Sequence, residues 1–435
     1  MKYEGTPPIW HLILKLFITL GLQYEYLYFV PILFSTMGIW IIVFKLKIPN
    51  ILKILLPFTY FILYEYTIKA RSYCLLLPIM AGIAWIYENR KEHVYIYNFL
   101  LGLLATVSLH GSLISGILFL CEIIEILKEF QQQGNIKKYY KECISVIILA
   151  ILYIFIILII YPAQDVYIGI TIDLFKKNGF TIAFLMCVIK ILQAIILGQN
   201  VFITNLIISA IFFILLLIFS LKENKNWKLF LSVLSVIILF LCCIRFVNQH
   251  IGLVLYTFLF VLYLTKNSIP EKNKNVLKIL LTIMFMIQIV WSYKNMALEI
   301  NNTYSAGRDV AEYLKTREYE ELDIYASGYY ATAILPYFDN NIFDNDRGGE
   351  SYYIWSFNNE DWNWASSEEY IYPDDIAVNS DIIILHINHM EEGYSTLIEK
   401  VRASNKYKET IYDGKAFFKG HIANSEGYYV FERID

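Results

Sequence analysis

The sequence predicts a polytopic, all-α membrane bundle of about ten spans that carries an α/β domain at its C-terminal end. Three observations support this fold class. Apolar residues make up 57% of the chain and the mean hydropathy is +0.49, above the roughly 45–50% apolar content of soluble domains. Membrane-length apolar segments recur as far as residue 295. From about Glu299 the composition becomes charged and aromatic instead.

The spans follow from the length rule that a transmembrane helix needs about 20 predominantly apolar residues. They are predicted at 25–44, 51–68, 72–88, 95–109, 112–128, 143–161, 201–221, 229–245, 249–265 and 276–293. Two further apolar stretches, 8–22 and 181–197, contain polar residues such as Lys15, Lys190 and Gln193. We predict that both stretches are helices lying in the membrane interface.

The orientation follows from the basic residues, which cluster in alternate loops and so mark the cytoplasmic side. These residues are Lys45, Lys47 and Lys53; Arg90 and Lys91; Lys128, Lys137, Lys138 and Lys141; Lys222, Lys225 and Lys228; and Lys266, Lys272, Lys274 and Lys278. A full span at 181–197 would move the loop at 222–228 outside, against its lysines. The membrane part is therefore 25–295. The N-terminal segment, 1–24, and the domain that follows the membrane part are predicted to lie on the outer side.

The C-terminal domain, 299–435, has the pattern of a small mixed α/β fold. A helix is predicted at Arg308–Lys315, and strands are predicted at Asp323–Ala326, at Asp381–Leu385 and in a terminal pair around Ala416–Lys419 and Tyr428–Glu432. This domain is either an accessory cap or a domain with its own chemistry. It contains no cysteine, which suits the surface of a bacterial cell.

Several classes of function are disfavoured by composition. The net charge is -3 and the lysines are scattered between apolar runs, so nucleic acid is not expected as a partner. The sequence contains no metal-ligand spacing, no Gly-rich phosphate loop and no nucleophile elbow. We therefore predict no metal and no cofactor.

Four ionisable residues fall at the outer ends of separate predicted spans: Arg71, His110, Arg245 and His250. Each alone could be an interfacial anchor whose long or polar side chain reaches water. Together, two arginines and two histidines at one level suit an anionic group such as a lipid phosphate, because guanidinium groups bind phosphate bidentately and imidazoles add hydrogen bonds. Ionisable residues at membrane depth also point to function by default.

Short motifs around these residues give the membrane part a family resemblance. They are the run EGTPPIWHLILKLF at 4–17, Ala70-Arg71-Ser72-Tyr73, Leu109-His110-Gly111, Arg245, and His250-Ile251-Gly252-Leu253. In order and spacing they resemble the GT-C superfamily of polytopic glycosyltransferases, which use polyprenyl-phosphate-linked sugars, as in bacterial lipopolysaccharide and mannosyl-transfer families. The resemblance covers about two thirds of the chain, and the first motif is its most specific part.

The resemblance implies inverting transfer of a sugar from a polyprenyl phosphate carrier to a lipid or glycan acceptor on the outer face. It implies a carboxylate of the first outer loop as general base, which would be Glu4 here. The residues implied to bind substrate are Thr6, Arg71, Tyr73, His110, Arg245 and His250. Membrane lipids are the other expected partners of a multi-pass protein in the cell membrane.

One feature departs from the family pattern. The family has a first span followed by an acidic pair that supplies the base, whereas Glu4 is the only carboxylate before the motif helix. The favoured expectation is an N-terminally shortened form that lacks this pair; in the other interpretation Glu4 acts as the base. A transporter or flippase of lipid-linked saccharides, and a non-catalytic remnant, remain as alternative functions. A transporter is disfavoured because no internal repeat is visible.

Overall fold

The structure is a computed structural model that describes residues 7–69, 71–133, 139–161, 179–196, 203–243, 250–326, 331, 333–343, 380–387, 392–418 and 421–434. Three predicted site residues, Glu4, Thr6 and Arg245, lie outside the described residues. The chain divides into two compact units: a helical unit that ends at Ser292 and a second unit that begins at Tyr293.

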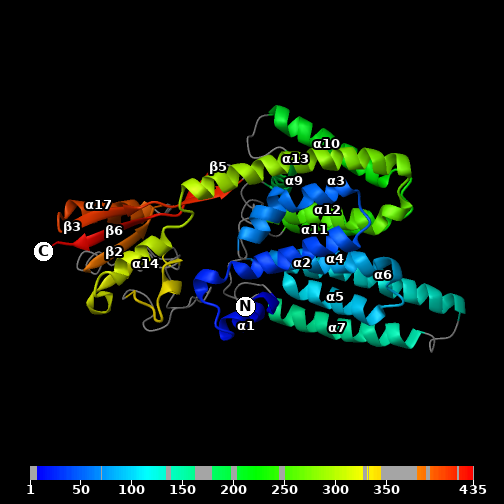
Figure 1. Ribbon diagram of the computed structural model, residues 1–435, viewed down its shortest axis with the longest axis horizontal. Coiled ribbons are helices and arrows are strands. Elements are labelled where there is room, and N and C mark those ends of the chain that lie inside the picture. The colour runs from blue at the N-terminus through cyan, green and yellow to red at the C-terminus, as the bar shows by residue number, and fades with distance from the viewer. Residues whose placement is uncertain are drawn as a thin grey trace. The chain divides into compact units, whose positions relative to one another are not determined.

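The helical unit is a bundle of helices (Figure 1). Its α-helices are α1 (Ile9–Thr19), α2 (Phe29–Lys45), α3 (Asn50–Leu55), α4 (Leu76–Ile86), α5 (Val94–Val107), α6 (Leu109–Gln133), α7 (Tyr140–Ile160), α9 (Phe180–Ile196), α10 (Ile203–Leu221), α11 (Trp227–Cys243), α12 (Ile251–Thr265) and α13 (Glu271–Asn301). Shorter helical turns are η1 (Tyr24–Tyr26), η2 (Leu56–Phe58), η3 (Phe61–Ile68), η4 (Ser72–Leu75), η5 (Tyr87–Asn89) and η8 (Lys266–Ser268).

Lipid-facing surface identifies this unit as part of a helical membrane protein. Within the described residues, five helices are long and apolar enough to cross a membrane, or six if one bent pair forms a single span. On α7, the side chains of Ile148, Ile151 and Leu158 are 61%, 62% and 71% exposed. Side chains of this kind require an apolar solvent outside the protein. The predicted total of ten spans includes shorter helices such as α5 and α11, so that number stays a prediction.

The segment predicted as one span at 51–68 is broken in the middle. Asn50–Phe58 and Phe61–Ile68 are inclined at 40° to each other. Pro57 has no N–H to continue the helix, and Thr59 adopts an extended conformation. The Ser292 hydroxyl donates to the Phe58 carbonyl oxygen at 2.8 Å and so satisfies one acceptor at the break. The chain then continues as η3, a π-helix, a form that often marks functional sites.

The basic loops of the helical unit lie at one end of the bundle. Polar contacts join them: the Lys47 N–H donates to the Tyr263 hydroxyl at 3.2 Å, Lys266 pairs with Glu88 at 3.1 Å, and Lys272 pairs with Glu223 at 3.0 Å. Each contact joins two segments that are far apart in the sequence and that carry or adjoin basic residues. The side of the membrane that these segments face stays a prediction.

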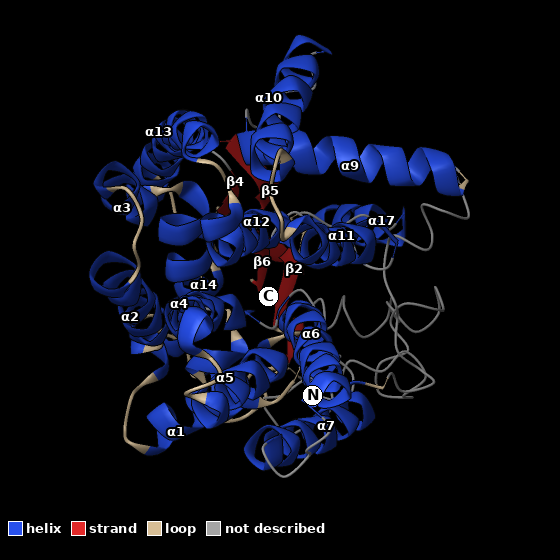
Figure 2. Ribbon diagram, turned by 90° about the vertical axis from the view of Figure 1, so that its right-hand side faces the viewer, coloured by secondary structure: helices blue, strands red, loops and turns tan. Residues whose placement is uncertain are grey.

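The helix predicted to lie in the interface, α9, runs across the bundle. Figure 2 shows α9 lengthwise where α6 and α11 are seen nearly end-on. Ala183, Cys187 and Ile191 form its buried stripe at a spacing of four residues, and Lys190 is exposed. The segment after α10 contacts the start of α13 through the Lys272–Glu223 ion pair.

Among its described residues, the second unit contains two small sheets and two α-helices. Its elements are α14 (Gly307–Lys315), η9 (Tyr319–Glu321), β1 (Ile324–Ala326), η11 (Leu335–Tyr337), β2 (Ile382–His386), α17 (Glu392–Ala403), β3 (Tyr407–Tyr412), β4 (Lys415–Phe418), β5 (His421–Ser425) and β6 (Tyr428–Arg433). The larger sheet has the order β1-β2-β6-β3, in which only β1 and β2 are parallel. The smaller sheet pairs β4 with β5.

Strand β2 forms the centre of this unit because all five of its residues are buried. Successive side chains of a strand point to opposite faces. Ile384 accordingly packs with Val310 of α14, whereas Ile383 packs with Val401 of α17. The predicted terminal strands both exist as β4 and β6, but they belong to different sheets and do not pair with each other.

Candidate functional site

Three predicted site residues meet in a group that we call the histidine cluster: Tyr73, His110 and His250. The ring centroids of the two histidines are 4.6 Å apart, and those of Tyr73 lie 6.3 Å from His110 and 5.6 Å from His250. All three side chains are buried, with exposed fractions of 9%, 4% and 5%. Residues far apart in the sequence therefore converge at one place, as the sequence pattern predicts.

His110 is positioned by the tight junction between α5 and α6. Ser108 is extended and separates the two helices, and its hydroxyl accepts the Gly111 N–H at 3.1 Å. A Cβ at Gly111 would collide with the Leu104 carbonyl oxygen, so only glycine allows the two helices to approach this closely. The Ser112 hydroxyl donates to the Ala105 carbonyl oxygen at 2.6 Å across the same crossing.

His250 is positioned by a similar close approach at the start of α12. A Cβ at Gly252 would lie 2.6 Å from the Tyr66 hydroxyl oxygen and would also meet the Phe61 ring. The glycine therefore lets α12 press against η3. Because His250 immediately precedes α12, this packing fixes the place of its ring.

A second layer of aromatic and charged side chains supports the cluster from η3. The Tyr66 ring lies 5.4 Å from Tyr73 between centroids and 5.1 Å from Tyr256. Its neighbour Glu65 is only 2% exposed, accepts a hydrogen bond from the Tyr60 hydroxyl at 3.1 Å, and pairs with Lys69 at 3.1 Å. Burying a carboxylate is costly unless it is paired and hydrogen-bonded, and here both conditions are met.

Three of these residues, Glu65, Tyr60 and Lys69, are not among the predicted site residues. A usable signal was present, because Glu65 and Lys69 stand four residues apart at the end of an apolar segment, the spacing of a helical ion pair. The aromatic residues gave no comparable signal, since a tyrosine in a span can equally face lipid.

Arg71 lies beside this layer along the chain. It is exposed and immediately precedes η4, the short helix that contains Tyr73. Two cations, Lys69 and Arg71, thus lie between the end of η3 and the start of η4. Of the seven predicted site residues, the structure brings together Tyr73, His110 and His250 and places Arg71 next to them in the chain.

The chemistry available here is that of anion recognition. Imidazole N–H groups and a tyrosine hydroxyl can donate hydrogen bonds, and a guanidinium adds a bidentate fork. Within the part of the chain that the structure describes, no group of three or more His, Cys, Asp or Glu side chains could hold a metal ion. The described residues thus offer cations and hydrogen-bond donors for a phosphate or similar anion.

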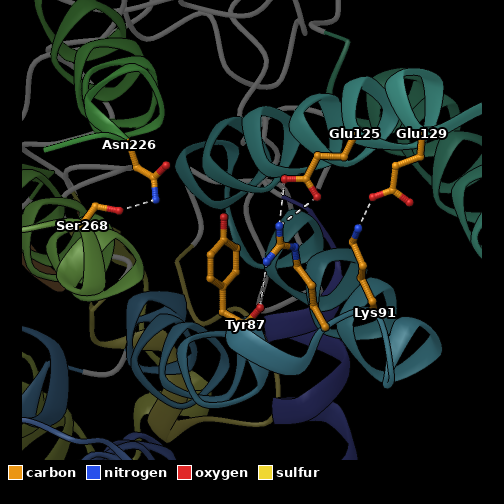
Figure 3. A network of polar contacts seen from close by, with 7 residues as sticks. Tyr87, Lys91, Glu125, Glu129, Asn226 and Ser268 are labelled. Atoms are coloured by element: carbon orange, nitrogen blue, oxygen red, sulfur yellow. Dashed lines mark hydrogen bonds and ion pairs between the residues drawn. The ribbon is translucent and has the colours of Figure 1, made fainter. Parts of the chain in front are cut away.

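The opposite end of the α5–α6 hairpin has a different character (Figure 3). Arg90 donates to both carboxylate oxygens of Glu125 at 2.8 Å and lies over the Tyr87 ring, while Lys91 pairs with Glu129. These cations are already held by carboxylates. This end is a structural clamp, and the histidine cluster is the better candidate site.

Comparison of the chain with protein-family models, with curated proteins and with solved structures finds no match.

Proposed function

We propose that this chain is a membrane glycosyltransferase of the GT-C type, which moves a sugar from a polyprenyl phosphate carrier to a lipid or glycan acceptor on the outer face of the membrane. One observation supports it most directly. Two buried histidines from separate helices lie ring against ring beside Tyr73, next to a turn that carries Lys69 and Arg71. An anionic headgroup attached to a lipid tail would suit such a place.

The proposed reaction requires little from the cluster beyond binding and charge stabilisation. The acceptor hydroxyl oxygen attacks the anomeric carbon, the bond from that carbon to the phosphate oxygen breaks, and the polyprenyl phosphate leaves with the electron pair. Arg71 and the imidazoles stabilise the growing negative charge on the phosphate. The hydroxyl proton passes to a carboxylate, for which Glu4 is the predicted residue.

The proposal includes a topology. The joined basic loops face the cytoplasm, the histidine cluster faces the other side, and the C-terminal domain lies outside. The two ends are separated by the length of α12, which has 15 residues and therefore spans about 22 Å. A carrier with its phosphate at the outer surface would then reach the cluster without crossing the membrane.

A transporter or flippase of lipid-linked saccharides is the second candidate, and the broken pair of helices favours it. Discontinuous spans with ionisable side chains are common at transport sites. Here Glu65 lies on η3, three residues from its end, and its neighbour Tyr66 contacts Tyr73. Glu65 thus lies near the histidine cluster, at the same end of the bundle. This position fits a site at the membrane interface better than a site at the midplane.

The experiment measures binding of a polyprenyl phosphate by the full chain in lipid nanodiscs. We expect saturable binding that is lost in His250→Ala and kept in His93→Ala, because His93 is an exposed histidine near the basic end. Transfer of a radiolabelled sugar from a panel of polyprenyl-phosphate sugars then identifies the enzyme. Movement of the lipid between leaflets without transfer identifies a transporter, and equal binding by both variants refutes the site.

A further inference from the structure

A second binding site is suggested by a cavity of about 640 Å³ in the helical unit, within the roughly 300–1,000 Å³ usual for small-molecule sites. It lies among α2, α3, α4, α12 and α13, and its walls include Leu46, Leu52, Leu77, Met80 and Phe260. All five of these side chains are buried within the unit. The interior of this cavity, which we call the basal groove, therefore suits a hydrocarbon chain.

The mouth of the basal groove is basic. Four lysines and two glutamates line it: Lys47, Lys266, Lys274 and Lys278, with Glu88 and Glu271. Glu88 pairs with Lys266 and Glu271 with Lys274, each at 3.1 Å. Lys47 and Lys278 have no ion pair within the part of the chain that the structure describes. With four lysines and two glutamates, the mouth has two more positive charges than negative ones.

The mouth is also fixed in shape. The Lys47 backbone N–H donates to the Tyr263 hydroxyl at 3.2 Å, and the Lys266 ammonium lies 3.5 Å from the centroid of the Tyr263 ring. Tyr263 therefore ties the loop after α2 to the end of α12. A preformed mouth lowers the ordering cost of binding.

Two of the helices that form the walls of the groove also face lipid. Phe44 on α2 and Ile54 on α3 are 69% and 62% exposed and belong to the surface that faces lipid. The groove therefore lies beside the bilayer, whereas a soluble peptide would first have to pass through the headgroup layer. An apolar interior, a lipid-facing flank and an excess of two positive charges at the mouth together suit one class of ligand.

We propose that the basal groove binds an anionic phospholipid, with one acyl chain along the apolar wall and the headgroup phosphate at Lys47 and Lys278. Basic pockets between membrane helices bind acidic lipid headgroups through this combination of contacts. The basic mouth lies at the opposite end of α12 from the histidine cluster, because Lys266 follows α12 and His250 precedes it. Only the inner wall of the groove reaches Tyr256, which packs against Tyr66. The inference therefore does not depend on the proposed transfer reaction.

The test measures phospholipid retention by the purified full chain with native mass spectrometry, using phosphatidylglycerol and phosphatidylcholine. The variant is the double change Lys47→Gln with Lys278→Gln. The matched control is Lys222→Gln with Lys225→Gln, which removes the same charge from exposed lysines outside the groove. A basic side chain near an acidic lipid contributes about 1 kcal/mol, so two should change affinity about 30-fold.

The expected result is preferential retention of phosphatidylglycerol, reduced about 30-fold in the groove variant and nearly unchanged in the control. Equal losses in both double variants would show a general surface-charge effect and overturn the proposal. So would equal retention of the two phospholipids by the unaltered chain. Displacement of phosphatidylglycerol by a polyprenyl phosphate at equal concentration would overturn it too, because the groove would then be a carrier site.

Discussion

Replacing Gly252 by alanine tests the packing that holds His250 in place. The added Cβ would lie 2.6 Å from the Tyr66 hydroxyl oxygen and would meet the Phe61 ring as well. Both rings are fully buried, so neither can move aside without disturbing its neighbours. Overpacking a well-packed core costs about 1–3 kcal/mol. The helix propensity gained from alanine offsets at most about 1 kcal/mol of this.

Gly82→Ala is the matched control. Its Cβ would meet only the Leu100 side chain, at 3.4 and 3.8 Å, which are ordinary contact distances. Gly82 also lies inside α4, where alanine is the better helix former by about 1 kcal/mol. The control should therefore be neutral or stabilising.

Thermal unfolding of the full chain in detergent gives the readout through a thiol-reactive dye, because Cys74, Cys187 and Cys242 are buried in the folded protein. We expect Gly252→Ala to melt below the unaltered chain and Gly82→Ala to melt at or above it. If Gly252→Ala were as stable as the control, the close contact of α12 with η3 would be refuted, and with it the stated reason for the placement of His250.

Three further predictions follow from the orientation, the cations and one surface ion pair. A reporter fused after Asp435 should be active outside the cytoplasm and one fused after Gln133 should be active inside; the reverse pattern contradicts the topology. Arg71→Lys should weaken polyprenyl phosphate binding, because lysine keeps the charge but lacks the bidentate fork; unchanged affinity counts against the role. Arg402 donates to both oxygens of Glu409 at 2.8 and 2.7 Å and lowers the pKa of that carboxylate. The pair therefore stabilises the fold above the ordinary glutamate pKa of about 4.3, by about 0.2–1 kcal/mol, and loses this effect in acid. The melting difference between the unaltered chain and Glu409→Gln should shrink between pH 7 and pH 4, and a constant difference excludes the linkage.

The apolar segments predicted most helices, because a helix in lipid must have an apolar surface and hydropathy measures this property directly. The ends of the helices were predicted less well where polar side chains form hydrogen bonds or ion pairs with other helices. The span predicted at 112–128 extends over Leu109–Gln133 as α6, since Glu122 accepts from Asn98 at 2.9 Å and Glu125 pairs with Arg90. Such pairing lies between helices and is invisible in a single segment.

The unpredicted elements also have physical reasons. Strand β3 lies at the edge of its sheet. Its side chains are exposed or half-buried, and none of them is buried. It therefore shows little of the apolar alternation by which strands are recognised. The break before η3 was signalled by Pro57, whose effect on a helix is known, but length and hydropathy alone suggested a continuous span.

The candidate site was predicted in part. Residues at the ends of separate spans could be assigned to one level from the topology, and the structure brings Tyr73, His110 and His250 into contact. The spacing of Glu65 and Lys69 was a usable signal for an ion pair, but the contact of Tyr66 with Tyr73 could not be predicted, because it depends on a π-helix that turns Tyr66 toward the protein interior. Local deviations of this kind arise from packing and leave no periodic pattern.

Photo-cross-linking with a polyprenyl phosphate that carries a diazirine near its phosphate tests the central claim most directly. The full chain in nanodiscs is irradiated, digested and mapped by mass spectrometry, with and without excess unlabelled carrier. We predict competed labelling in Arg71–Leu77 and at the start of α12, around His250–Tyr256. Labelling confined to other segments, or labelling in these two that excess carrier does not suppress, would contradict the assignment of the histidine cluster as the carrier site.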